Sequence, residues 1–86
     1  MVRLFIPVSL RPLTGGQGQV DVEATTLREA IAALEQQCPG IRQQLCEGDG
    51  LAPTLQVAID NTMTRRMAAP LQPGSEIHFL PAIGGG

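Results

Sequence analysis

Residues 71–86 read Leu-Gln-Pro-Gly-Ser-Glu-Ile-His-Phe-Leu-Pro-Ala-Ile-Gly-Gly-Gly, and this stretch decides the fold. Its Pro-Gly pair at 73–74 favours a turn. After the turn, Ile77 and Phe79 alternate with other residues, which is the pattern of a strand with one buried face. The predicted strand passes directly into Pro-Ala-Ile and three glycines. We therefore expect the last core strand of the domain to lead into a tail.

The first residues predict a second strand with one buried face. Val2, Leu4, Ile6 and Val8 occupy every second position, and Pro7 favours an end or edge of that strand. Residues 10–18 are rich in turn formers, and the alternation resumes at 20–23. Together these segments predict a hairpin with a wide loop.

A helix is predicted to begin after Thr26. Thr26 and Glu29 form a capping box, in which the Thr26 hydroxyl accepts from a first-turn amide and Glu29 accepts from the cap's own N–H. Apolar residues then follow at spacings of three and four, which predicts one face against a sheet. They are Leu27, Ala30, Ile31, Leu34 and Cys38. The pair Pro39-Gly40 ends this helix.

Two further elements follow. Residues 41–46 favour a short second helix, and 55–59 alternate as a strand that ends at the turn signal Asp60-Asn61. The order of elements predicts an α+β, ubiquitin-like β-grasp fold, with a mixed sheet of four to five strands and one main helix on one face. We expect residues 1–86 to form a single domain, in which 81–86 are a flexible C-terminal tail.

Composition excludes several classes of partner. The formal charge is −2, and all six basic residues are arginines. Without clustered cations, neither nucleic acid nor an anionic membrane is an expected partner. Cys38 and Cys46 do not form a disulfide framework, and no segment approaches the about 20 apolar residues of a membrane span. We therefore expect a protein of the reducing cytoplasm.

The glycine tail is the candidate functional site. Glycine has no Cβ, so Gly84 and Gly85 could thread a channel too narrow for side chains. The functional group is then the carboxylate of Gly86, an anion at neutral pH because its ordinary pKa is about 3.5. Such a group must be activated by a partner, and adenylation followed by attack of a sulfur nucleophile would leave a C-terminal thiocarboxylate.

The chain resembles the MoaD/ThiS family of ubiquitin-like sulfur carriers, in particular molybdopterin synthase small subunits. Residues 7–16, 34–42 and above all 71–86 carry the resemblance, in which Gly85 and Gly86 take the family's functional positions. Two residues depart from the family pattern: Gly84 stands where Ala is usual, and Ser75 replaces an Asp after the turn glycine.

The resemblance implies a protein carrier, not an enzyme, with no bound cofactor and no metal. ATP would be used by an E1-like adenylyltransferase similar to MoeB or ThiF. The sulfur donor would be a rhodanese or cysteine desulfurase, and the acceptor a molybdopterin synthase large subunit or a sulfhydrylase. A metallopeptidase that trims residues beyond the glycines is a further possible partner.

The destination of the sulfur stays open at this point. Molybdopterin is the first choice, followed by cysteine or homocysteine, thiamin and sulfur-containing siderophores. Two other functions compete: a ubiquitin-like modifier joined to lysines of target proteins, and a β-grasp interaction module with an inert tail.

A partner-binding surface is expected on the exposed sheet face near the tail, with contributions from Phe5, Leu80, Ile83, Arg65 and Arg66. The remaining chemistry-bearing residues carry weaker signals. The segment 14–19 lacks the Lys-Ser/Thr end of a P-loop, the two cysteines lack zinc-site spacing, and His78 has no nucleophile motif beside it.

Overall fold

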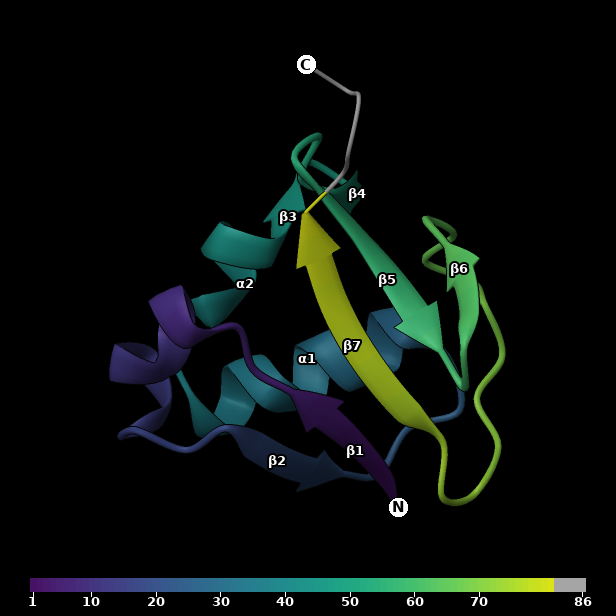
Figure 1. Cartoon of the computed structure of the whole chain (residues 1–86), viewed down its shortest axis with the longest axis horizontal. Coiled ribbons are helices and arrows are strands. Elements are labelled where there is room, and N and C mark those ends of the chain that lie inside the picture. The colour runs from purple at the N-terminus through teal and green to yellow at the C-terminus, as the bar shows by residue number, and fades with distance from the viewer. Residues whose placement is uncertain (82–86) are drawn as a thin grey trace.

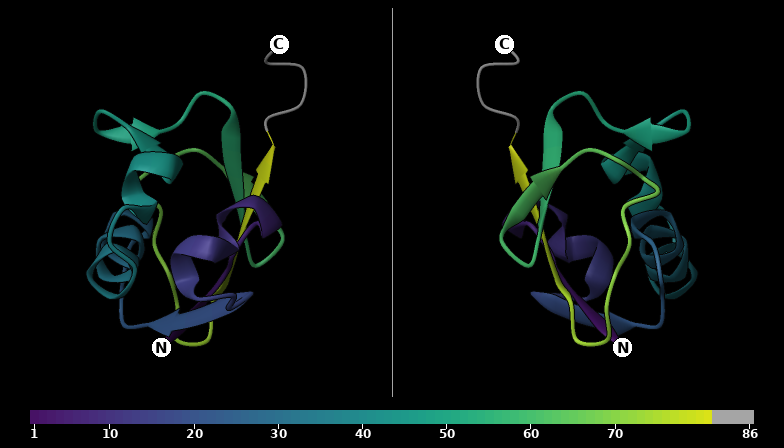
Figure 2. Two further views of the ribbon diagram at one scale, coloured as in Figure 1. Left: turned by 90° about the vertical axis from the view of Figure 1, so that its left-hand side faces the viewer. Right: turned by 90° about the vertical axis from the view of Figure 1, so that its right-hand side faces the viewer.

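The computed structural model describes residues 1–81. A mixed sheet of five strands in the order β2-β1-β7-β5-β6 forms one layer, and helix α1 (Leu27–Gln37) covers one face of it (Figures 1 and 2). The strands of this sheet are β1 (Val2–Phe5), β2 (Gln19–Val22), β5 (Leu55–Ile59), β6 (Thr62–Thr64) and β7 (Glu76–Pro81).

Strand β7 lies at the centre of the sheet. It pairs in parallel with β1, with Leu4 opposite Ile77, and antiparallel with β5, with Val57 opposite Phe79. The remaining neighbours, β1 with β2 and β5 with β6, are antiparallel. This topology confirms the predicted β-grasp fold, including the last strand beside the first.

Helix α1 begins at the predicted cap. The Glu29 N–H donates to the Thr26 hydroxyl at 3.2 Å. The Glu29 carboxylate, however, accepts from the N–H of Thr25 at 2.9 Å and from the Thr25 hydroxyl at 2.8 Å. The return bond of the capping box is therefore made one residue earlier than predicted, and it ties the helix to the chain that enters it.

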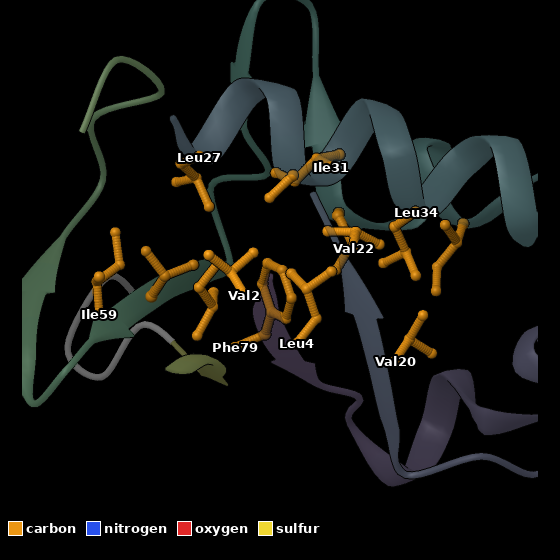
Figure 3. Close-up of a cluster of buried hydrophobic side chains, with 14 of the residues drawn as sticks. Val2, Leu4, Val20, Val22, Leu27, Ile31, Leu34, Ile59 and Phe79 are labelled. Carbon is orange, nitrogen blue, oxygen red and sulfur yellow. The ribbon is translucent and has the colours of Figure 1, made fainter. Parts of the chain in front are cut away.

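The core lies between α1 and the covered face of the sheet (Figure 3). Leu27, Ile31 and Leu34 project from the helix onto strand residues that alternate as the sequence predicted. The strand contribution is Val2, Leu4, Val20, Val22, Val57, Ile59, Ile77 and Phe79. Cys38, at the end of the same helix, is buried with them.

The segment after β1 differs from the predicted wide loop. Residues Val8–Thr14 form a 3-10 helix, which begins directly after Pro7. Val8 was expected in the buried alternation of the first strand, but it is 73% exposed. The backbone of Pro7 starts a turn in which the Leu10 N–H donates to the Pro7 carbonyl at 2.9 Å, so the strand stops before Val8.

Between α1 and β5 the predicted short helix is present as α2 (Ile41–Leu45), and both of its terminal side chains are buried. A small hairpin that the sequence did not predict follows, formed by β3 (Cys46–Glu47) and β4 (Gly50–Leu51). Within residues 1–81, no helix has the length and apolar character needed to cross a membrane.

Candidate functional site: the sheet face and the base of the C-terminal segment

The predicted tail residues Gly84, Gly85 and Gly86, together with Ile83, lie outside the residues that the structure describes. The described chain runs to Pro81, which was expected to be the first tail residue and is the last residue of β7. The glycines are therefore joined to the central strand of the sheet through Ala82 and Ile83.

We call residues 82–86, which follow β7 in the sequence, the C-terminal segment. The end of β7 and the start of β5 form the base of this segment. Leu55 lies opposite Pro81, and Gln56 lies opposite Leu80. The Gln56 side-chain amide donates from Nε2 to the carbonyl of Pro81 at 3.3 Å. A side chain of the neighbouring strand thus contacts the last described peptide group before the glycines.

The sheet face opposite α1 carries a row of residues from four strands. Phe5 lies opposite His78, His78 opposite Ala58, and Ala58 opposite Met63. The rings of Phe5 and His78 stack, with centroids 4.1 Å apart and planes inclined by 6°. Met63 is 48% exposed. Apolar surface therefore extends across this face from β1 to β6.

Leu80 extends this surface toward the base of the C-terminal segment, because it lies on β7 two residues beyond His78 and is half-buried. The structure places both Phe5 and Leu80 on this face. A function in partner binding stays a prediction for both residues.

Charged side chains border the apolar row on the side away from the glycines. Arg3 Nε lies 3.0 Å from Asp21 Oδ1, and both side chains are about half exposed. The hydrogen bond from Arg3 lowers the pKa of the Asp21 carboxyl. An exposed pair of this kind contributes little stability, so it acts as a polar edge to the surface.

The two predicted arginines differ in what they contact. The Arg65 guanidinium donates to the carbonyl of Leu55, at the start of β5. Arg66 is exposed, and its main-chain N–H donates to the Thr64 hydroxyl at 3.1 Å. The structure thus gives Arg65 an internal contact, and partner binding by either arginine stays a prediction.

Ser75, the second predicted departure from the family pattern, is buried and takes part in a hydrogen-bond network with exposed residues at the start of β7. The Ser75 hydroxyl donates to Asp60 Oδ2 at 2.7 Å and accepts from the Gln72 N–H at 2.9 Å. The Glu76 N–H donates to Asp60 Oδ1 at 2.9 Å, and this bond is the main reason that the pKa of Asp60 is lowered. Ser75 therefore fastens the β5–β6 turn to the turn before β7.

The cysteines offer no reactive centre. Both side chains are free and buried, and burial raises the pKa of the Cys46 thiol. Among residues 1–81, no group of three or more His, Cys, Asp or Glu side chains gathers in a way that could hold a metal ion. The hydroxyl of Thr14, the last residue of the 3-10 helix, lies within hydrogen-bond distance of the carbonyls of Arg11 and Gln17.

Sequence reasoning missed Gln56, Ala58 and Met63 as members of the site. The turn signal at Asp60-Asn61 followed by Thr-Met-Thr could have revealed β6, because both turn residues have positive φ, as in tight hairpin turns. Once β6 is placed, period two puts Met63 on the exposed face.

Comparison with known proteins gives consistent results. The model of the ThiS family matches residues 4–86. The sulfur carrier protein CysO of Mycobacterium tuberculosis is 31% identical over 91 residues, which cover 99% of this chain and 98% of the relative.

Two solved structures are similar over nearly the whole chain. A chain of the BexX/CysO complex from Amycolatopsis orientalis has a TM-score of 0.91 and 28% identity, with 100% of both chains covered. CysO from Mycobacterium tuberculosis has a TM-score of 0.88 and 29% identity, covering 96% of this chain and 100% of that one.

Proposed function

Because the chain belongs to the ThiS family of ubiquitin-like sulfur carriers, we propose that it transports sulfur as a thiocarboxylate on Gly86. The observation that carries this proposal is the family match, which extends through the three glycines that follow the central strand β7. Like other carriers of this family, the chain is a protein co-substrate and not a catalyst.

Three physical features support Gly86 as the reacting residue. Glycine backbone carries no side chain that would obstruct a narrow channel. The glycines follow strand β7, which is hydrogen-bonded to a neighbouring strand on each side. A partner that binds the sheet therefore also fixes where the C-terminal segment begins. The thiols of Cys38 and Cys46 are both buried, so neither is exposed to receive sulfur from a partner.

The proposed reaction has two steps. The Gly86 carboxylate attacks the α-phosphate of ATP on the activating enzyme, which forms an acyl adenylate and releases pyrophosphate. A hydrosulfide equivalent then attacks the acyl carbon, AMP leaves, and the thiocarboxylate remains. The thiocarboxylate is an anionic sulfur nucleophile, as thiolates are, and it can deliver its sulfur to an acceptor.

The relatives change the order of the proposed pathways. Molybdopterin was the first choice from sequence, but the relatives at 28–31% identity are named CysO. We therefore place cysteine, which the sequence left open, ahead of molybdopterin as the destination of the sulfur. The corresponding acceptor would be a sulfhydrylase in place of a molybdopterin synthase large subunit.

The proposed docking surface is the exposed sheet face with Phe5, His78, Ala58, Met63 and Leu80. Its apolar row and the stacked rings give a partner contact area next to the base of the C-terminal segment. A carrier must leave each partner after its reaction, and an interface of moderate size exchanges readily. A similar chain comes from the BexX/CysO complex, which supports docking to a partner protein.

The test of the proposed function is ATP-dependent modification by a cognate E1-like enzyme. Purified chain, enzyme, ATP and sulfide are combined, and the mass of the intact chain is followed. A gain equal to an exchange of oxygen for sulfur, localised to Gly86 by fragmentation, supports the proposal.

The competing function as a modifier predicts a different product. In that case the chain would accumulate joined to lysine side chains of other proteins, and the free thiocarboxylate would stay absent. The 86 residues contain no lysine, so this test is not complicated by lysine-linked chains of the carrier itself.

A further inference from the structure

The carbonyl of Leu55 lies where the hydrogen-bond ladder between β5 and β6 stops. The register pairs Val57 with Thr64, so continuing it by two residues would place Arg66 opposite Leu55. Strand β6 ends at Thr64, however, and the Arg66 N–H donates to the Thr64 hydroxyl. The ladder therefore gives the Leu55 carbonyl no main-chain donor from β6, although a strand carbonyl without a partner costs free energy.

The Arg65 side chain supplies the missing donor. Its Nη1 donates to the Leu55 carbonyl, and its Nη2 lies 3.5 Å from the carbonyls of Leu51 and Ala52, at the outer limit of a hydrogen bond. A guanidinium has several donors in a fixed planar fork, which suits it to neighbouring carbonyls. Arg65 thus joins the end of β6 to the turn that precedes β5.

The start of β5, directly after this turn, forms one side of the base of the C-terminal segment. Leu55 pairs with Pro81, and Gln56 Nε2 donates to the Pro81 carbonyl. The start of β5 therefore contacts the end of β7 on one side and the Arg65 guanidinium on the other.

We infer that Arg65 is a positioning residue, which fixes the place where the chain leaves the sheet after Pro81. This inference rests on the proposed function, because a defined starting point matters only if the glycines enter a partner's active site. Without Arg65, β5 and the end of β7 adopt a wider range of positions, and entry into the partner requires more ordering. The Michaelis constant for the carrier then rises, whereas the turnover of correctly bound carrier changes little.

The test compares Arg65→Gln with Arg28→Gln. The control removes an exposed arginine of α1, on the other face of the sheet, whose guanidinium makes no hydrogen bond to residues 1–81. In Arg65→Gln we expect faster hydrogen exchange in residues 51–57 and a KM for adenylation raised about three- to tenfold, a change of the size expected for ordering a few groups. Arg28→Gln should leave exchange in 51–57 and the KM within about twofold of the wild type.

A competition experiment separates positioning from direct docking. Full-length Gly85→Phe serves as an inhibitor of adenylation, because its C-terminal segment is too bulky to enter the narrow channel of the activating enzyme. If Arg65 positions the C-terminal segment, Gly85→Phe and the double variant with Arg65→Gln inhibit equally well. If the double variant inhibits more weakly in proportion to the KM change, Arg65 docks to the partner directly and the inference is overturned.

Further outcomes separate this inference from the proposed function. If the wild type is adenylated and Arg65→Gln keeps the wild-type KM, the inference fails and the proposed function stands. If the wild type is never adenylated, the proposed function fails and the inference fails with it. Should Arg65→Gln not fold, Arg65→Lys keeps the charge and one donor to Leu55, and its KM is expected to exceed that of Arg28→Lys. Equal values for the two lysine variants would overturn the inference.

Discussion

The imidazole of His78 lies flat against the ring of Phe5, with ring centroids 4.1 Å apart and planes inclined by 6°. The contact joins the first and last strands of the sheet on the face opposite α1. Because both side chains are half-buried, the stacked pair presents an apolar, planar surface to solvent. This surface lies beside Leu80, close to the base of the C-terminal segment.

Phe5→Ala removes one half of this stacked pair. We expect the free energy of unfolding to fall by about 1 kcal/mol, the scale of an aromatic contact. The KM for the activating enzyme should rise by more than this loss of stability explains, since the docking surface loses its largest member. Chemical denaturation and steady-state kinetics measure the two effects.

Val8→Ala is the matched control for Phe5→Ala. Val8 is 73% exposed but lies on the 3-10 helix, outside the row of paired strand residues. Its stability and KM should stay close to those of the wild type, because exposed substitutions rarely change stability by more than about 0.5 kcal/mol. Equal KM changes in both variants would argue against a docking function of the sheet face.

Ser75→Ala tests the hydrogen-bond network that the Ser75 hydroxyl makes at the start of β7. Ser75 is 2% exposed, and its hydroxyl serves both Asp60 and the Gln72 N–H. Removing it leaves the Gln72 donor and the Asp60 carboxylate without this partner, and we expect a loss of about 1–3 kcal/mol in the free energy of unfolding. Urea denaturation measures the loss, and a value near zero would show that water replaces the hydroxyl.

Asp60→Asn tests the acid sensitivity of the fold. The Glu76 N–H and the Ser75 hydroxyl lower the pKa of Asp60 in the folded state. The unfolded chain therefore binds this proton first as the pH falls, so the contribution of Asp60 to stability is present near neutrality and is lost below about pH 4. Asp60→Asn should show a flatter fall in the free energy of unfolding across that range, and asparagine tolerates the positive φ of 49° at this position.

Asp49→Asn is the control for the acid series. Asp49 is an exposed carboxylate in the turn between β3 and β4, and it has no hydrogen-bond partner among the described side chains and backbone of residues 1–81. The free energy of unfolding of Asp49→Asn should fall with decreasing pH as it does in the wild type. If the free energy of unfolding of Asp60→Asn falls as steeply as that of Asp49→Asn, other carboxylates cause the acid sensitivity.

Thr26→Ala tests the start of α1. The Thr26 hydroxyl accepts from the Glu29 N–H, and losing an N-cap of this kind costs about 0.5–2 kcal/mol. Thr26→Ser keeps the acceptor and should retain most of the stability. Thermal unfolding of the two variants distinguishes a capping contribution from the loss of the threonine methyl group.

Local signals in the sequence predicted the elements that depend on periodicity and capping. The Thr26 cap, the helix stripe from Leu27 to Leu34 and the strand around Ile77 and Phe79 are all present. The predicted neighbouring of the first and last strands was also confirmed. These features are predictable because each depends on residues close together in the sequence or on the alternation of buried side chains.

Features that depend on tertiary contacts were not predictable. Val8 continues the alternation of β1 in the sequence, but the turn that begins at Pro7 places it in solvent. Nothing near Arg65 indicates that its guanidinium meets the Leu55 carbonyl, because that contact depends on where β6 ends. The stacking of Phe5 on His78 likewise required the register between β1 and β7.

The most direct test of the central claim is the intact mass of the chain after incubation with its activating enzyme, ATP and sulfide. We predict a gain equal to one exchange of oxygen for sulfur, located at Gly86 by fragmentation and absent in Gly85→Phe. An unchanged mass in the wild type would contradict the claim that Gly86 carries the sulfur. An equal gain in Gly85→Phe would contradict the claim that the backbone before Gly86 must lack side chains.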